Sequence, residues 1–145
     1  MAEARLILDS GALSALAEGE PLAIAWAKIA TTKGMLLAIP APVLAECTTG
    51  RASDARVNMV LRKLELGVID TTAAIAREAG SLRFLAKAPD KTVDALIVAT
   101  STLFPRSILL TSDPDDLTAL ANHRPDAHLS IRSVNATPSP AACAK

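Results

Sequence analysis

Short apolar runs alternate with helical patterns along this chain. The run at residues 6–8 is typical of a buried strand that ends at Asp9, and four further runs have the same character, at residues 35–39, 68–69, 107–110 and 129–134. Strands separated by helices need crossover connections, which places them side by side in a mainly parallel sheet. The pattern therefore predicts an α/β domain with helices on both faces of one central sheet.

Helical spacing fills most of the segments between these strands. The clearest stripe is formed by Val57, Val60, Leu61 and Leu64, at positions i, i+3, i+4 and i+7 of a helix that starts near Ser53 and is stopped by Gly67. Thr71 or Thr72 can cap the next helix, which reaches Pro89. The other predicted helices cover residues 11–17, a segment that begins at Pro42 and carries Glu46, residues 92–104 and residues 114–121.

Length and composition indicate a single soluble domain. The chain has 145 residues, half of them hydrophobic, and we expect one domain at residues 1–135 followed by a flexible tail, rich in Pro, Ala and Ser, at residues 136–145. Cys47 and Cys143 suggest no disulfide framework. Residues 6–8 are too short for a signal sequence, and the longest charge-free stretch, residues 34–45, is too short to span a membrane. These features favour a cytoplasmic protein without membrane contact.

Opposite charges gather in different parts of the chain, although the formal net charge is zero. Residues 51–91 carry eight bases and five acids, whereas residues 92–126 carry two bases and five acids. One region can therefore face phosphate and the other a cation. The balance argues against a duplex DNA binder, which needs a strongly basic surface.

Four acids occupy positions that suggest a common site. Asp9 and Asp113 follow predicted strands, while Glu46 and Asp94 lie in the helices that start near the same edge of the sheet. Ligands of open α/β sheets bind outside the carboxyl ends of the strands. Convergent carboxylates repel one another unless a cation neutralises them, so the pattern predicts a hard metal with oxygen ligands, Mg²⁺ or Mn²⁺.

Other interpretations of the same residues are open at this stage. Asp9, Asp94 and Asp113 can each serve as a helix cap or as a first-turn acid. His123 and His128 have no zinc-site spacing and fit an exposed position better, and Cys47 fits core packing better than catalysis. The chain also lacks the glycine-rich motifs that bind nucleotide phosphates.

Four motifs then give the sequence a family resemblance that covers nearly all of the chain except the tail. LDSGAL at residues 8–13, PVLAE at 42–46, VDALI at 93–97 and LTSD at 110–113 resemble, in order and spacing, the acidic motifs of the PIN-domain family. The closest likeness is to VapC-type toxins of bacterial toxin–antitoxin pairs. The resemblance implies a three-layer α/β/α nuclease fold with a mainly parallel central sheet, whose acids bind Mg²⁺ or Mn²⁺ and cut RNA.

The resemblance also implies roles for single residues. Asp9, Asp94 and Asp113 would hold the metal, with Glu46 as a further catalytic acid. An additional acid matches Asp115 or Asp116, and we favour Asp116 because Leu117 follows it. The hydroxyls of Ser10 and Thr111 would lie beside the metal and help to bind the substrate.

RNA recognition should depend on phosphate contacts, since the chain has no Tyr, two Phe and one Trp with which to stack bases. Arg51 is the first candidate for these contacts, and five further bases share its charge and its part of the chain: Arg56, Arg62, Lys63, Lys87 and Lys91. The apolar stripe of the helix at residues 53–66 can serve core packing, a homodimer face or a groove for an antitoxin helix. The resemblance implies that a small antitoxin covers the acidic site.

Three alternative functions remain at this point. The chain can be a PIN-type RNA-processing nuclease without an antitoxin, although its compact length favours the toxin. It can be a non-catalytic scaffold, which the presence of all four acids argues against. A phosphotransfer receiver phosphorylated on Asp9 would need a lysine near the end of the fourth strand, and the sequence has no convincing one.

Overall fold

Five parallel strands form the centre of the molecule in the computed structural model, which describes residues 4–138. The strands follow the spatial order β3-β2-β1-β4-β5. Their bounds are Arg5–Leu8 for β1, Leu36–Pro40 for β2, Gly67–Ile69 for β3, Ile108–Thr111 for β4 and Ser130–Ser133 for β5. Every neighbouring pair is parallel, so the predicted mainly parallel sheet is confirmed.

The two central strands carry the most deeply buried positions of the sheet. Leu6, Ile7 and Leu8 of β1 pair with residues 108–110 of β4, and all six side chains are almost fully buried. Such continuous apolar runs are expected for strands that are covered on both faces. Since β1 and β4 are in register, Asp9 and Thr111 leave the sheet at the same edge.

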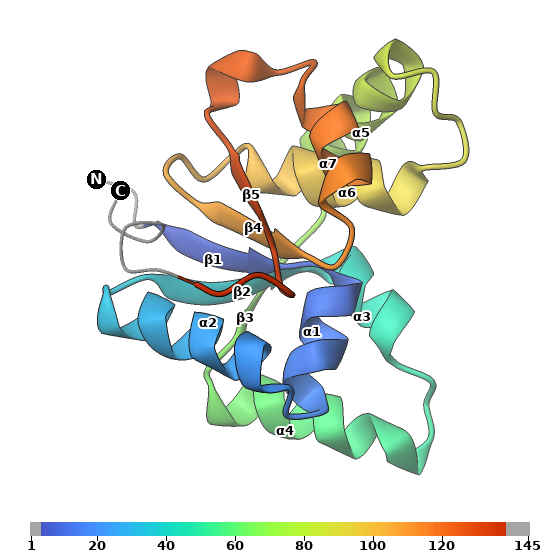
Figure 1. Cartoon of the computed structure of the whole chain (residues 1–145). Coiled ribbons are helices and arrows are strands. Elements are labelled where there is room, and N and C mark those ends of the chain that lie inside the picture. Colours follow the sequence, from blue (N-terminus) through green and yellow to red (C-terminus); the bar gives the residue numbers. More distant parts are fainter. Residues whose placement is uncertain (1–3, 139–145) are drawn as a thin grey trace.

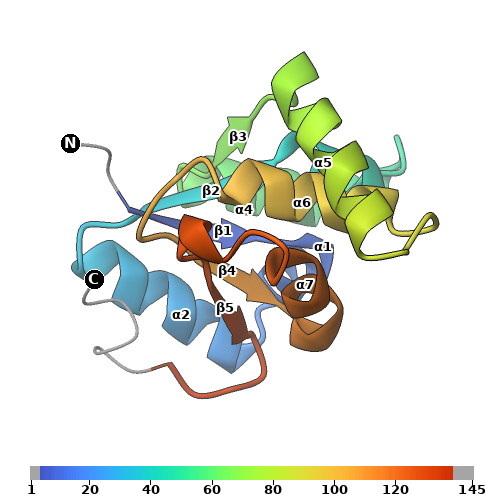
Figure 2. The ribbon, with the colours of Figure 1, turned by 90° about the horizontal axis from the view of Figure 1, so that it is seen from above.

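Helices cover both faces, as Figures 1 and 2 show, and complete the expected three-layer α/β/α arrangement. One layer contains α1 (Ser10–Ala17), α2 (Pro21–Thr32) and α4 (Ala55–Lys63), and the other contains α5 (Ala73–Leu85), α6 (Thr92–Ser101) and α7 (Pro114–Ala121). The short helix α3 (Ala41–Cys47) contacts both α1 and α6 at the carboxyl end of the strands. Two single-turn 3-10 helices lie at Ala52–Asp54 and Pro125–Ala127.

Helix α2 is the element that the hydrophobic pattern does not predict. Its sequence, PLAIAWAKIATT, is apolar on most of its circumference and therefore shows no amphipathic stripe. The two ends nevertheless carry local signals, because Pro21 occupies the first helical turn and Gly34, with φ of +78°, follows the last turn. Trp26 and Ala30 of this helix are buried in the core.

Two predicted helix ends are wrong. Helix α4 stops at Lys63 and not at Gly67, because Glu65 adopts a left-handed conformation and the amide of Leu66 returns to the carbonyl of Leu61. Gly67 instead begins β3. Helix α6 ends at Ser101, three residues earlier than predicted. The chain turns after it, where the amides of Leu103 and Phe104 donate to the carbonyls three residues before them.

The last described residues pack against the helical layer of α2. The indole Nε1 of Trp26 donates a hydrogen bond of 2.9 Å to the carbonyl of Ala136, the first residue of the predicted tail. Residues 139–145 of that tail, with Cys143, lie outside the described residues. Among residues 4–138, no helix is long and apolar enough to cross a membrane.

Candidate functional site

Asp9 lies at the junction of β1 and α1, where both of its carboxylate oxygens are engaged. Oδ1 accepts the amide of Ala12 at 2.9 Å and so caps α1, while Oδ2 accepts the hydroxyl of Thr111 at 2.5 Å. The capping interpretation is therefore correct for one oxygen of Asp9. The other oxygen connects β1 to the end of β4, which a helix cap does not require.

Glu46 reaches the same region from α3. Its Oε1 accepts a hydrogen bond from the hydroxyl of Ser10, the residue that follows Asp9. The side chain of Glu46 is exposed, whereas Asp9 is half-buried. Ser10 and Thr111, the two hydroxyl residues singled out in the sequence, each bind a carboxylate.

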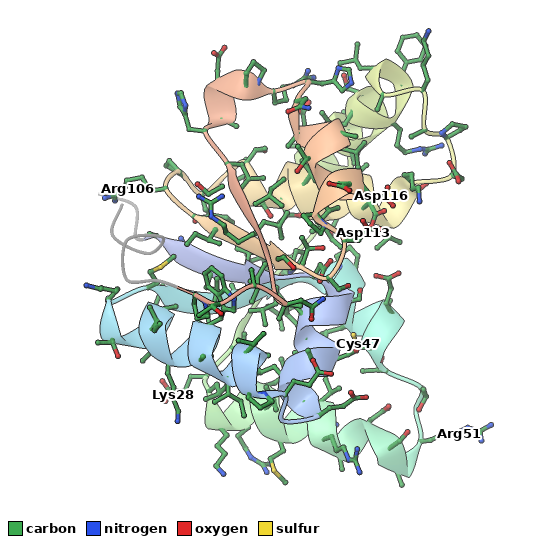
Figure 3. The ribbon with its side chains drawn as sticks, in the orientation of Figure 1. Lys28, Cys47, Arg51, Arg106, Asp113 and Asp116 are labelled. Carbon is green, nitrogen blue, oxygen red and sulfur yellow. The ribbon has the colours of Figure 1, made fainter. Side chains whose placement is uncertain are left out.

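Asp94, Asp113 and Asp116 come from the opposite helical layer. Asp94 is the third residue of α6, and Asp113 occupies the N-cap position of α7 without making a side-chain cap. The amide of Asp113 donates to the Thr111 hydroxyl at 2.9 Å. Asp116, in the first turn of α7, accepts a hydrogen bond from Lys91 Nζ at 3.2 Å. Figure 3 shows Asp113 and Asp116 on the side where the strands end.

Electrostatic interactions connect these acids into one cluster. Burial is the main cause of a raised pKa at Asp9, and repulsion from Glu46 adds to it, while hydrogen bonds from Thr111, Ala12 and Ser112 oppose it. Burial also raises the pKa of Asp94, followed by repulsion from Asp116, Glu46 and Asp9, with Lys91 acting in the opposite direction. Asp9 therefore senses the charge of Glu46, and Asp94 senses the charges of Asp116, Glu46 and Asp9.

Asp116 differs from the other acids because a base lies beside it. The hydrogen bond from Lys91, and after it one with Asp113, lowers the pKa of Asp116. In return, Asp116 raises the pKa of Lys91, first through the hydrogen bond and then through charge attraction, with smaller effects of Asp94 and Asp90. Asp115, the other residue considered for the additional acid, is exposed.

The donor chemistry of this cluster fits a hard divalent cation. All of its ligand atoms are carboxylate or hydroxyl oxygens, which Mg²⁺ and Mn²⁺ prefer. Within residues 4–138, no group of three or more His, Cys, Asp or Glu side chains could hold a metal ion as they stand. A cage of three carboxylates would therefore form only when the side chains turn toward a bound cation.

The predicted phosphate-binding bases occupy different parts of the surface. Arg51 lies in the exposed connection between α3 and α4, and its side chain points outward, away from Asp113 and Asp116 (Figure 3). Arg56, Arg62 and Lys63 lie on α4, in the layer opposite α7. Lys91 is the member of the predicted set that the structure places in contact with the acids.

Two further expectations concern residues around the cluster. His123 and His128 are exposed, as predicted. Cys47 is half-buried against the core, and its thiol donates to the Ser10 carbonyl at 3.5 Å. Burial raises the pKa of this thiol, which keeps it protonated and supports the packing interpretation.

A close contact between Gly11 and Ser112 is a feature that sequence reasoning does not single out. A Cβ atom built on Gly11 would lie 2.0 Å from the Ser112 hydroxyl oxygen and 2.8 Å from its Cβ. The absence of a side chain at Gly11 therefore allows the turn after β4 to approach the start of α1. A glycine inside the first turn of a predicted helix is the signal that could have indicated it.

An apolar groove lies between α2 and α4, in the layer opposite α7. Its volume is about 580 Å³. Lys28, Lys63, Thr31 and Thr32 contribute to its lining, which is otherwise aliphatic: Leu16, Ile24, Ala27, Met59, Val60 and Leu64. Met59 is 52% exposed and Leu64 is 37% exposed. Figure 3 shows Lys28 on this layer, well separated from Asp116.

Comparisons with known proteins agree with this architecture. The family model described as "PIN domain" matches residues 6–122, which include all five acids of the cluster. No curated protein matches the sequence. Among solved structures, a toxin–antitoxin complex from Klebsiella pneumoniae is similar in fold, with a TM-score of 0.59 and 24% identity over 77% of this chain and 88% of that chain.

Proposed function

This chain belongs to the PIN-domain family, and we propose that it is a metal-dependent endoribonuclease that acts as the toxin of a cytoplasmic toxin–antitoxin pair. The observation that carries the proposal is the cluster of Asp9, Glu46, Asp94, Asp113 and Asp116, since members of this family are generally nucleases that depend on divalent metals. The similar fold of a chain from a toxin–antitoxin complex supports the toxin assignment.

Asp9, Asp94 and Asp113 are the proposed metal ligands. Burial raises the pKa of Asp9 and of Asp94, a penalty on their charged forms that a bound cation would offset, and the Asp113 carboxylate makes no side-chain cap on α7. A bound Mg²⁺ or Mn²⁺ would lower the pKa of a water molecule and neutralise charge on the phosphoryl oxygens. The hydrogen bonds from Ser10 and Thr111 orient Glu46 and Asp9 for this task.

The proposed reaction is hydrolysis of an RNA phosphodiester. A water oxygen forms a new bond to phosphorus, the bond to one ribose oxygen breaks, and a phosphate monoester and a free hydroxyl result. The carboxylates of the cluster are the groups placed to take the proton of the attacking water, and no histidine is needed as a base. Arg51 stays a predicted phosphate contact for a distant part of the RNA strand.

The groove between α2 and α4 is the proposed binding site of an antitoxin helix. Its aliphatic lining fits the apolar face of an amphipathic helix, and the charges of Lys28 and Lys63 in the lining fit acidic side chains on the flanks of that helix. A basic side chain of the antitoxin inserted among the carboxylates would block the metal site. We also propose a homodimer, which light scattering on the purified chain would detect.

Cleavage of end-labelled cellular RNA tests this proposal. The purified chain is incubated with Mg²⁺, with Mn²⁺ and with EDTA, next to an Asp9→Asn variant. We expect cutting that requires the metal and is lost in the variant, and the ends of the fragments would identify the preferred site. Metal binding by calorimetry without cutting would argue that another RNA is the substrate. If the chain neither cuts RNA nor binds a metal, the nuclease proposal is contradicted and a binding scaffold is favoured.

A further inference from the structure

Lys91 is a cation placed at the edge of a cluster of acids. Its Nζ lies 3.2 Å from Asp116 Oδ2, and the negative charges of Asp94 and Asp90 act on it as well. A second ion pair, between Arg124 and Glu78, connects the chain after α7 to α5. The Lys91 ammonium is thus a positive charge that lies against acids of the proposed active site.

The stability of helix α6 does not explain this lysine. Lys91 occupies the N-cap position of α6 and makes no side-chain cap there. A positive charge at the N-terminus of a helix is opposed by the helix dipole, and Ser, Thr, Asp or Asn is the usual cap. The advantage of a lysine at this position must therefore come from what its ammonium group contacts.

The backbone holds Lys91 in place while the end of its side chain remains accessible. Its amide donates to the Ala88 carbonyl at 3.1 Å, and its carbonyl accepts the Ala95 amide at 2.9 Å. The side chains of Lys91 and Asp116 are 41% and 44% exposed. A ligand that arrives from solvent can thus reach the ammonium without displacing the core.

We propose that Lys91 is a catalytic residue whose ammonium binds a non-bridging oxygen of the scissile phosphate, and that Asp116 is the positioning residue that aims it. This inference rests on the proposed nuclease function. Negative charge grows on the non-bridging oxygens as water attacks phosphorus, so a fixed ammonium stabilises the transition state more than the bound RNA. Lys91 keeps its proton throughout and transfers none.

The contact between Lys91 and Asp116 also distinguishes Asp116 from Asp113, the other acid at the N-terminal end of α7. Among the described residues, Asp113 makes no ion pair and no side-chain cap, and its side chain is hydrogen-bonded to the other acid, Asp116, so no base competes with a metal for it. Asp116 is committed to Lys91. Asp116 should therefore influence catalysis through the lysine, and the effects of changing the two partners should not add up.

The test compares Lys91→Gln with Lys91→Arg and with Lys33→Gln, which removes the same charge at the exposed C-terminal end of α2, outside the acid cluster. With the RNA and metal of the cleavage assay, we expect Lys91→Gln to lower kcat on the order of 10²-fold, in the range found for loss of one transition-state donor. Lys91→Arg should recover part of the rate, and Lys33→Gln should change it less than about twofold. A Lys91→Gln/Asp116→Asn double variant should be no slower than Lys91→Gln alone.

Two measurements without cleavage distinguish a phosphate contact from a merely structural charge. Calorimetry with Mn²⁺ alone should show no loss of metal affinity in Lys91→Gln, because removal of a cation leaves the acids at least as attractive to the metal. In an Asp9→Asn background, where RNA is bound and not cut, loss of one phosphate contact should reduce the slope of log K against log salt by about 0.7.

The possible outcomes separate this inference from the function on which it rests. If wild type cleaves RNA and Lys91→Gln retains both its kcat and its salt slope, the role of Lys91 is wrong and the nuclease stands. A kcat that falls only in parallel with Mn²⁺ affinity would also overturn it, because Lys91 would then act on the metal site. If wild type neither cleaves nor binds RNA with any metal, both proposals fail.

Discussion

The hydroxyl of Thr111 donates a hydrogen bond to Asp9 Oδ2 at 2.5 Å and accepts one from the amide of Asp113 at 2.9 Å. Thr111 is the last residue of β4, is fully buried and lies beside the end of β1. One side-chain oxygen thus fixes the Asp9 carboxylate and the start of the turn that carries Asp113. The pairing of β1 with β4 therefore sets how far Asp9 lies from Asp113.

Replacement of Thr111 by valine should damage the site more than the fold. The methyl group has nearly the volume of the hydroxyl, but the Asp113 amide loses its acceptor and the Asp9 carboxylate loses the largest of the interactions that oppose the rise in its pKa. We expect a free energy of unfolding lower by about 1–3 kcal/mol, because two hydrogen bonds of a partly buried site are lost together. The acidic limb of the pH–rate profile should move to higher pH.

A Thr111→Ser variant is the matched control for this experiment, because it keeps the hydroxyl and loses only the methyl group. Its pH–rate profile should coincide with that of wild type within experimental error. A valine variant whose acidic limb does not move would show that the Thr111 hydroxyl does not influence the ionisation of Asp9.

Asp9→Asn should increase stability at neutral pH while it removes the proposed activity. The folded-state pKa of Asp9 is raised above its ordinary value of 3.8, so the native state binds the proton more tightly than the unfolded state does. The charged carboxylate therefore destabilises the native state above the folded pKa. The penalty declines as pH falls through that pKa and vanishes below 3.8. Asparagine carries no charge, so in EDTA at pH 7 its Tm should exceed that of wild type.

Calorimetry at two pH values tests the sign of this effect. The difference in Tm between Asp9→Asn and wild type should be positive at pH 7 and close to zero at pH 3, and saturating Mn²⁺ should raise the Tm of wild type alone. A variant less stable than wild type at pH 7 in EDTA would mean that the hydrogen bonds of the carboxylate outweigh its burial.

The sequence predicts where the site lies in the fold better than it predicts which side chains contact each other there. The apolar runs that end at Asp9 and at Thr111 locate the edge of the sheet, because a parallel sheet brings successive carboxyl ends together. The hydrophobic pattern does not reveal α2, since a helix buried on most sides has no polar stripe to set its period. The Lys91–Asp116 pair depends on how α6 packs against α7, which no local signal encodes.

Gly11→Ala should be strongly destabilising, because the added Cβ would meet Ser112 at distances far below van der Waals contact. Either the turn after β4 or the start of α1 must move. We expect a loss of about 1–3 kcal/mol in the free energy of unfolding, in the range for overpacked sites. Cleavage activity should fall as well, since both Asp9 and Asp113 adjoin the displaced segments. Chemical denaturation and the RNA assay measure the two effects.

Gly80→Ala provides the control, because Gly80 lies inside α5 and a Cβ there would meet no atom within 4 Å. Alanine at that position should stabilise the helix by roughly 0.5–1 kcal/mol. A Gly11→Ala/Ser112→Gly double variant removes the colliding side chain and should regain much of the lost stability. Failure of this rescue would show that Gly11 is required for another reason.

Met59→Glu should abolish tight antitoxin binding without affecting cleavage of RNA. Met59 is 52% exposed and lines the groove between α2 and α4, where a carboxylate would face the apolar side of a docked helix. Loss of such an anchor costs 2 kcal/mol or more, which corresponds to roughly thirtyfold in affinity. The partner to use is the proposed antitoxin, and its binding is measured by calorimetry.

Phe84→Glu is the control, because it introduces the same charge at an apolar residue that is 82% exposed on α5, outside the groove, and it should leave binding unchanged. If both variants bind as wild type does, the antitoxin lies elsewhere, and if Phe84→Glu alone is defective, the α5 face is the interface.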